Sequence, residues 1–302
     1  MSDLSYFAAC NESGEVHTVL SSNLQVDIAL SGLEKWDNAN RQAWIWVKVP
    51  SVSSSADTVL YLYYDRDQPD NTNYAGDTNS AQAENVWNSS FIAIYHMAQT
   101  PNSTIYDSTN TNADLTSYGS MTASNLVDGM IGKAIDFDGS NDRLDSSAQI
   151  TFESFTFEVW AKADTWSSWR TFIAPDGDAR DFCTNAGRLT FWDAVERTIG
   201  PILSGTDWKH LVARYNDTAS SSRLRGFVNG TITGQTSNPS YSSLTGVVRI
   251  ASCLYGGSYV DFWDGRLDEV RISNTARSDA WIRASYESGR DDLLDYGSEE
   301  IK

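Results

Sequence analysis

The chain has 302 residues and carries 40 acidic against 22 basic side chains, a formal charge of −18. This charge argues against nucleic acids and anionic membranes as partners, because phosphate groups repel such a surface. No apolar run approaches the roughly 18 residues that a membrane-spanning helix needs. The acidic side chains are 29 Asp and only 11 Glu, and Asp favours turns and loops. The composition therefore predicts a loop-rich β protein whose acidity mostly serves turns and solubility.

The N-terminal residues and the cysteines bear on the cellular compartment. Residues 1–5 show no basic segment followed by an apolar stretch, so we expect no signal peptide. Cys10, Cys183 and Cys253 are too few for a disulfide scaffold, and no Cys-x-x-Cys pair indicates a zinc site. A bridge between Cys183 and Cys253 and three free thiols are the two alternatives that remain.

The first part of the chain contains two strand patterns. Residues 43–50 are aromatic and β-branched and end at a proline, and residues 59–64 repeat this pattern after a small polar connection. The two segments are expected to form a hairpin. Residues 65–84 are poor in large apolar side chains and predict a linker or long loop, with a short helical turn at 80–84.

Beyond the linker, short strand patterns recur between turn signals. They lie at residues 91–97, 134–137, 155–161, 170–174, 189–192, 210–215, 223–228, 247–251 and 267–272. Asn229-Gly230 predicts a tight hairpin, because both residues tolerate positive φ. Many short strands at this spacing predict an all-β fold, an antiparallel β-sandwich.

Alternation along the strand at 155–161 assigns its two faces. Phe155, Phe157 and Val159 share one face and are expected in the core, whereas Trp160 points the other way, toward a second packed layer. The one helix that the sequence strongly predicts spans residues 278–288. Ser278 would cap it, and Trp281, Ile282 and Tyr286 would form its packed side.

Five stretches in this order resemble the LamG-like, concanavalin A-like jelly rolls of bacterial and viral surface proteins. They are GKAIDFDGSND (132–142), FTFEVW (155–160), WKHLVA (208–213), FVNG (227–230) and GRLDEVRIS (265–273). The resemblance implies a jelly roll over residues 86–297 with a tail at 298–302. It also implies that Trp208 packs in the core. It does not specify a ligand.

The first 65 residues resemble the C-terminal part of a domain of unknown function that often precedes such jelly rolls. The similar stretches are EKWD (34–37), WVKVPS (46–51) and LYLYY (60–64). The domain usually has further strands upstream, and Asp65-Arg66 stands where a Gly-Asn turn is usual. The resemblance therefore implies a partial β unit at 1–65 and a linker at 66–85. This unit would pack against the jelly roll or against a partner, such as a second copy of the chain or a neighbouring protein in a particle.

The turn at 136–142 predicts a structural calcium site. Calcium binds six to eight oxygen ligands in flexible loops, and this turn supplies Asp136, Asp138 and Asp142. The jelly-roll resemblance implies that Asp268 comes near the same turn. The alternative is that these side chains only close the turn by hydrogen bonds to the backbone.

Aromatic residues in loop-like sequence predict a ligand-binding site. Aromatic rings flanked by polar groups bind the apolar faces of sugars. The candidate contacts are Trp166, Trp169, Arg170, Asp178, Tyr255, Tyr259 and Trp263. The alternative is that each aromatic ring packs against other side chains of the protein and contacts no ligand.

The sequence favours a protein without catalytic activity. The Glu-x-Asp-x-x-Glu strand of jelly-roll glucanases is absent, and no Gly-x-Ser-x-Gly elbow marks a nucleophile. We therefore expect an extracellular, cell-surface or virion-surface protein that binds a carbohydrate or a surface protein. A structural or decoration protein of a virus particle is the main alternative, and a glycan-degrading enzyme is a third.

Overall fold

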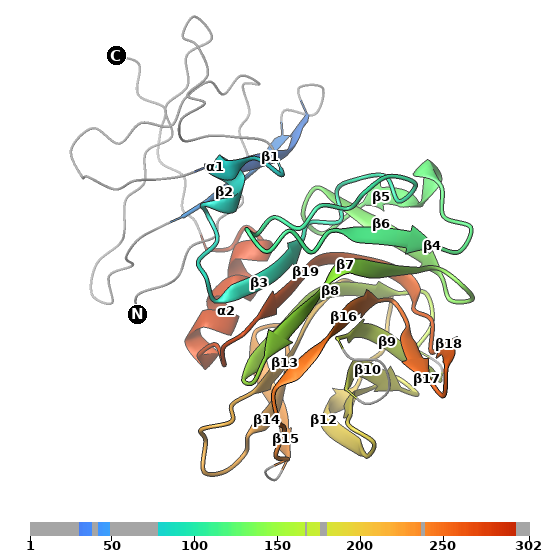
Figure 1. The fold of residues 1–302 in the computed structure, drawn as a ribbon, viewed down its shortest axis with the longest axis vertical. Coiled ribbons are helices and arrows are strands. Elements are labelled where there is room, and N and C mark those ends of the chain that lie inside the picture. The colour runs from blue at the N-terminus through green and yellow to red at the C-terminus, as the bar shows by residue number, and fades with distance from the viewer. Residues whose placement is uncertain are drawn as a thin grey trace, which may run out of the picture.

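The computed structural model describes residues 30–37, 42–48, 78–166, 168–175, 180–236 and 239–293. These residues form two large antiparallel sheets that share one hydrophobic core (Figure 1). The predicted all-β sandwich is therefore confirmed. Among these residues, no helix has the length and apolar character needed to cross a membrane.

The first sheet has seven strands. In spatial order they are β12 (Glu196–Ile202), β11 (Arg188–Trp192), β10 (Asp181–Asn185), β9 (Trp169–Ala174), β16 (Leu244–Ile250), β7 (Arg143–Phe152) and β4 (Leu115–Tyr118). The sequence predicted β9, β11 and β16 but not β4, β7, β10 or β12. The missed strands contain many Ser, Thr, Asp and Glu residues, which weakens the strand pattern.

The second sheet has eight strands. In spatial order they are β15 (Thr231–Thr236), β14 (Leu224–Val228), β13 (Lys209–Tyr215), β8 (Phe155–Ala163), β19 (Asp264–Ser273), β6 (Lys133–Asp138) and β5 (Leu126–Asp128), and β3 (Phe91–Tyr95) also pairs with β19. Asn229 and Gly230 have φ values of 51° and 70° and join β14 to β15, which confirms the predicted hairpin.

The inner and outer faces of β8 follow the predicted alternation. Phe155, Phe157 and Val159 are fully buried between the two sheets. Trp160 is buried on the opposite face, where its ring stacks on Tyr286 with centroids 5.7 Å apart. Both predictions are confirmed. Trp208 is only half-buried, whereas the expected place in the core would bury it fully.

Helix α2 (Asp279–Gly289) covers this outer face of the second sheet (Figure 1). The Ser278 side chain caps it by accepting a hydrogen bond from the backbone N–H of Trp281 at 3.1 Å. Trp281 and Ile282 join a second hydrophobic cluster beneath the helix. The predicted helix, its cap and its packed side are confirmed.

The N-terminal strands form a separate two-stranded antiparallel sheet of β1 (Leu30–Asp37) and β2 (Gln42–Val47). The sequence predicted β2 but paired it with residues 59–64, which lie outside the described residues, and it missed β1. The expected short helical turn is present as helix α1 (Ala81–Glu84), which Ser80 caps and which lies beside β1 (Figure 1).

Two short elements complete the described structure. A 3₁₀ turn, η1 (Ala123–Asn125), precedes β5, and a small hairpin of β17 (Cys253–Tyr255) and β18 (Ser258–Val260) lies near β9 at one end of the sandwich (Figure 1). Cys183 and Cys253 are buried, unbridged thiols. Burial raises the pKa of both.

Candidate ligand-binding site

The outer face of the seven-stranded sheet carries charged side chains on β7 and β16 and a tyrosine on the adjacent strand β4. Tyr118 on β4 pairs with Arg143 on β7, and Asp145 on β7 pairs with Arg249 on β16. Leu144 between the two β7 residues is fully buried in the core. Because neighbouring side chains of a strand point to opposite faces, Arg143 and Asp145 project outward.

The guanidinium group of Arg143 lies between two tyrosine rings. Its central carbon is 4.2 Å from the ring centroid of Tyr118 and 3.6 Å from that of Tyr259 on β18. These distances are typical of cation–π contacts. Its Nε also lies 3.4 Å from Oδ2 of Asp145. We call Tyr118, Arg143, Asp145, Arg249 and Tyr259 the tyrosine–arginine cluster.

Two polar atoms of this cluster are buried without a hydrogen-bond partner, namely Nε of Arg249 and Oδ1 of Asp145. The central guanidinium carbon of Arg249 lies 6.0 Å from the ring centroid of Tyr259. Burial raises the pKa of Asp145, and the positive charges of Arg143 and Arg249 offset only part of this effect. The cluster therefore retains unused donors and an unused acceptor.

The tyrosines of this region are open to solvent. Tyr118 is 43% exposed, Tyr259 38% and Tyr255 59%. Tyr259 pairs with Leu254 across the β17–β18 hairpin, so the adjacent Tyr255 points to the opposite side. Exposed rings beside charged donors and acceptors suit a ligand with both apolar and hydroxyl-bearing faces, such as a sugar.

Two of the predicted aromatic contacts are packed in the structure. Trp263 is fully buried, with its ring centroid 4.6 Å from that of Phe172 and 5.7 Å from that of Trp166. This corrects its assignment to ligand contact, because a loop position in sequence does not prevent a ring from folding back into the core. Trp166 is half-buried, and its Nε1 donates a hydrogen bond to the backbone oxygen of Gly205 at 2.7 Å.

The other predicted site residues make contacts outside the tyrosine–arginine cluster or lie outside the described structure. Trp169 is half-buried against Trp192, with ring centroids 5.6 Å apart. Arg170 donates to the backbone oxygens of Phe262 and Gly139 at 2.7 and 3.2 Å, so it holds two loops together. Asp178 lies outside the described residues.

Sequence reasoning found Tyr255 and Tyr259 but missed Tyr118, Arg143, Asp145 and Arg249. The alternation of Arg143, Leu144 and Asp145 was a usable signal for an outward charged face. The pairing of β7 with β16 was not readable from the sequence, because it joins positions about a hundred residues apart, and β4 was not predicted as a strand.

The predicted calcium ligands take part in three separate arrangements. Asp138 Oδ1 accepts backbone N–H groups of Ser140, Asn141 and Asp142 at 2.8, 3.0 and 3.2 Å. These are the side-chain to backbone hydrogen bonds that were expected if the carboxylates only close the turn and do not bind calcium. Oδ2 of Asp142 itself accepts the backbone N–H of Asp138 at 3.3 Å.

The remaining two predicted ligands are engaged elsewhere. Asp268 is fully buried, and its Oδ2 accepts the backbone N–H groups of Met130 and Ile131, both at 2.8 Å. Asp136 Oδ2 lies 3.8 Å from Nε of Arg266. Across the described ranges, no three His, Cys, Asp or Glu side chains are grouped so that they could hold a metal ion. The four carboxylates do not fit a single site, and calcium binding stays a prediction.

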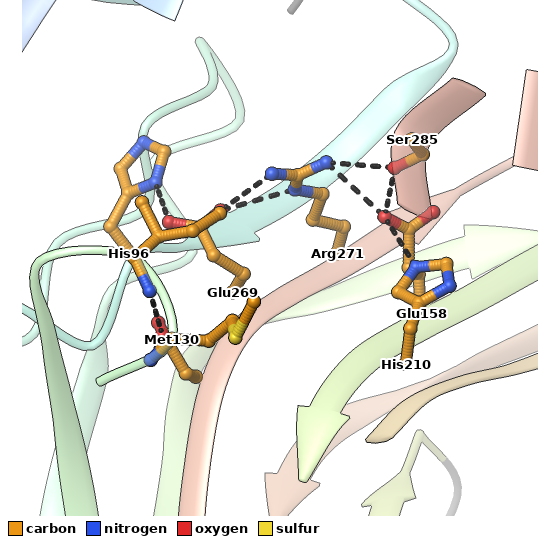
Figure 2. Close-up of polar contacts among 9 residues, drawn as sticks. His96, Met130, Glu158, His210, Glu269, Arg271 and Ser285 are labelled. Atoms are coloured by element: carbon orange, nitrogen blue, oxygen red, sulfur yellow. Dashed lines mark hydrogen bonds and ion pairs between the residues drawn. The ribbon is translucent and has the colours of Figure 1, made fainter. Parts of the chain in front are cut away.

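A second polar cluster lies on the outer face of the eight-stranded sheet, beneath α2, and Arg271 of β19 is at its centre (Figure 2). Its Nη2 donates to Glu269 at 2.8 Å, and its Nη1 donates to Glu158 at 3.2 Å. His96 Nδ1 lies 2.7 Å from Glu269, and His210 Nε2 lies 3.2 Å from Glu158.

These five side chains are almost completely shielded from solvent. Burial alone would raise the pKa of Glu158, but His210 and Arg271 outweigh it and lower the pKa to about 2. Ser285 of α2 also donates to Glu158 at 2.5 Å (Figure 2). We conclude that this buried ion-pair network attaches α2 to the sheet and is closed to ligands.

Two family models match different parts of the chain. Residues 138–283 match the concanavalin A-like lectin/glucanases superfamily, and residues 31–115 match a domain of unknown function, DUF2341. A comparison with curated proteins gives no match.

Solved structures with a similar fold are distant in sequence. Domain 4 of AbnA, a GH43 extracellular arabinanase from Geobacillus stearothermophilus solved with arabinotriose, matches with a TM-score of 0.50 and 15% identity over 64% of this chain and 96% of that chain. The binding domains of botulinum neurotoxin serotypes D/C and C1 match with TM-scores of 0.51 and 14% identity over 66% of this chain. The chain spans 52% of each toxin domain. Together with the family matches, these structures confirm the predicted resemblance to concanavalin A-like jelly rolls, here preceded by a match to the domain of unknown function.

Proposed function

We propose that this protein binds carbohydrate without acting on it, and that the tyrosine–arginine cluster forms the binding surface. The observation that carries the proposal is the position of Arg143 between the rings of Tyr118 and Tyr259, both partly open to solvent. Tyr255 on the same hairpin is also exposed but points to the opposite side, so it is not part of this surface.

The chemistry of these groups supports the proposal. The apolar face of a sugar ring stacks on tyrosine, and its hydroxyl groups pair with guanidinium donors and carboxylate acceptors. Within the described residues, Arg143 makes its hydrogen bond through Nε, to Asp145, so its two Nη groups are available for such pairs. The arabinanase domain that shares the fold was solved in complex with arabinotriose. At 15% identity this likeness supports a compatible fold and not a particular ligand.

The absence of catalysis is part of the proposal. Glu158 and Glu269 are buried carboxylates in ion pairs, and a general acid or base must reach the substrate. We also place the protein outside the cell or on a particle surface, where glycans are presented.

Binding to a glycan array, followed by titration calorimetry on the strongest ligand, tests the proposal. Tyr259→Ala should weaken binding by about tenfold or more through loss of stacking, whereas Tyr259→Phe should retain most of the affinity. Ile202→Ala is a matched control, because this side chain is exposed on β12, away from the cluster. Unchanged affinity in Tyr259→Ala and Tyr118→Ala would exclude this surface as the site.

The same samples test the alternative of an assembly protein. A decoration or structural protein should form a stable symmetric oligomer, and a free-standing binding protein should be monomeric. Light scattering after size-exclusion chromatography separates these cases. Release of reducing ends from a bound glycan would instead identify an enzyme.

A further inference from the structure

We propose that the glycan carries an acidic group, a carboxylate or a sulfate, and that Arg143 and Arg249 bind it. This inference rests on the proposed carbohydrate-binding function and specifies its ligand class. Its basis is the placement of two guanidinium groups beside a single carboxylate, Asp145, at the exposed tyrosines.

The donors of the two arginines are largely unused. A guanidinium group has five N–H donors. In the described part of the chain, Arg143 directs Nε to Asp145, and Nε of Arg249 is buried with no partner. The Nη groups of both arginines make no hydrogen bond within the described residues and are not buried, so an anion at the exposed tyrosines would accept from them.

The local charge also favours an anion. Arg143 and Arg249 carry two positive charges against one negative charge on Asp145, in a chain whose formal charge is −18. Two nearby carboxylates, Asp181 and Asp261, interact with Cys253, and the carboxylate of Asp142 accepts the backbone N–H groups of Ser120 and Asp138. Cys253 points to the side of the β17–β18 hairpin opposite Tyr259. The strands β4, β7 and β16 themselves therefore carry two positive side chains and one negative side chain.

The stacking of Arg143 prepares it for binding. A guanidinium group held between two rings loses little conformational freedom when it binds, so less of the interaction energy is lost to ordering. Its planar donors match the paired oxygens of a carboxylate or sulfate group. A neutral sugar would leave the charge of this pair uncompensated.

Matched pairs of oligosaccharides test the inference on the intact protein. Oligogalacturonides are compared with their fully methyl-esterified counterparts to probe the carboxylate. Sulfated maltohexaose is compared with unsulfated maltohexaose to probe the sulfate. An array adds the comparison of sialylated with asialo glycans. We expect the acidic member of a pair to bind about tenfold or more tightly, and its affinity to fall with added salt.

Variants connect this selectivity to the two arginines. Arg249→Gln and Arg143→Gln should remove most of the difference between acidic and neutral members, and Arg249→Lys should retain part of it. Arg283→Gln is the control, because it removes the same charge from the exposed surface of α2. Far-UV circular dichroism establishes that each variant is folded.

Three outcomes are distinguishable. Loss of acid selectivity in Arg249→Gln but not in Arg283→Gln supports the inference. Equal binding of acidic and neutral members, unchanged by Arg249→Gln, overturns the inference and leaves carbohydrate binding intact. If no member of the array binds, both the inference and the proposed function fail.

Discussion

The indole of Trp46 stacks on the imidazole of His96, with ring centroids 5.3 Å apart and planes inclined by 20°. Trp46 belongs to β2 of the N-terminal sheet, and His96 follows β3 of the jelly roll. The guanidinium carbon of Arg271 lies 4.7 Å from the centre of the same indole ring. One tryptophan thus joins the N-terminal strands to the buried ion-pair network of the jelly roll.

Replacing Trp46 should weaken this junction. Trp46 is almost fully buried, and Trp46→Ala should lower the free energy of unfolding by about 3 kcal/mol, the usual cost of removing a large buried aromatic. Chemical denaturation measures this change. Trp46→Phe keeps a ring at the position and should cost less. Identical denaturation midpoints for the wild type and Trp46→Ala would show that the contact contributes no stability.

Glu158 should make the protein more stable above acidic pH. Its pKa in the folded protein is about 2, against an ordinary value of 4.5. The unfolded chain therefore takes up this proton first as pH falls. The stabilisation is fully present above about pH 4.5, is lost as pH falls toward 2, and amounts to about 3 kcal/mol.

The variant Glu158→Gln isolates this effect. The difference in unfolding free energy between wild type and variant should shrink as pH falls from about 5 to about 2.5. Glu153→Gln, at an exposed position, should give a profile parallel to that of the wild type. A difference independent of pH for Glu158→Gln would contradict the assigned ion pairs.

Asp107 should have the opposite pH dependence. It is buried, and although its carboxylate accepts the backbone N–H groups of Ile94, Thr109 and Ala113, burial dominates and raises its pKa to about 6. The folded protein then holds a proton that the unfolded chain has released. Stability from this group is present below about pH 4 and is lost as pH rises toward 6.

The comparison of wild type with Asp107→Asn measures this contribution. Between pH 4 and 6 the wild type should lose about 3 kcal/mol relative to the variant, whose side chain does not titrate. Urea denaturation at pH 4, 5 and 6 is sufficient. A wild type that gains stability relative to Asp107→Asn over this range would refute the raised pKa.

Local patterns predicted those parts of the fold whose cause is local. The alternation of Phe157 and Trp160, the cap at Ser278 and the Asn229-Gly230 turn each depend on neighbouring residues alone. The tyrosine–arginine cluster depends on which strands are adjacent, and this is decided by packing between distant segments. Trp263 was misassigned for a related reason, since the core that receives its ring is built by residues from other strands.

Gly119 should not tolerate a side chain. Its φ is +98°, and a Cβ atom would lie 2.5 Å from Asp142 Oδ1 and 2.6 Å from Asn141 Oδ1. Gly119→Ala should therefore destabilise the protein by about 2 kcal/mol or more, from backbone strain and displacement of the Asp138 turn. Gly205→Ala is a control, because its φ is +77° but a Cβ atom there would meet no neighbour. Equal melting temperatures for the two variants would show that the contact with the turn is unimportant.

Calcium binding at the same turn is a prediction that melting experiments decide. Because Asp268 is fully buried and held by the backbone N–H groups of Met130 and Ile131, whereas Asp138 is exposed, we expect Asp138 and not Asp268 to bind the ion. Calcium at about 100 times its dissociation constant would add about 2.7 kcal/mol of stability, and the melting temperature should exceed that measured with chelator. Asp138→Asn should abolish this difference, whereas Asp268→Asn should lower the melting temperature and leave the difference intact. Equal melting temperatures of the wild type in calcium and in chelator would assign the Asp138 turn to hydrogen bonding alone.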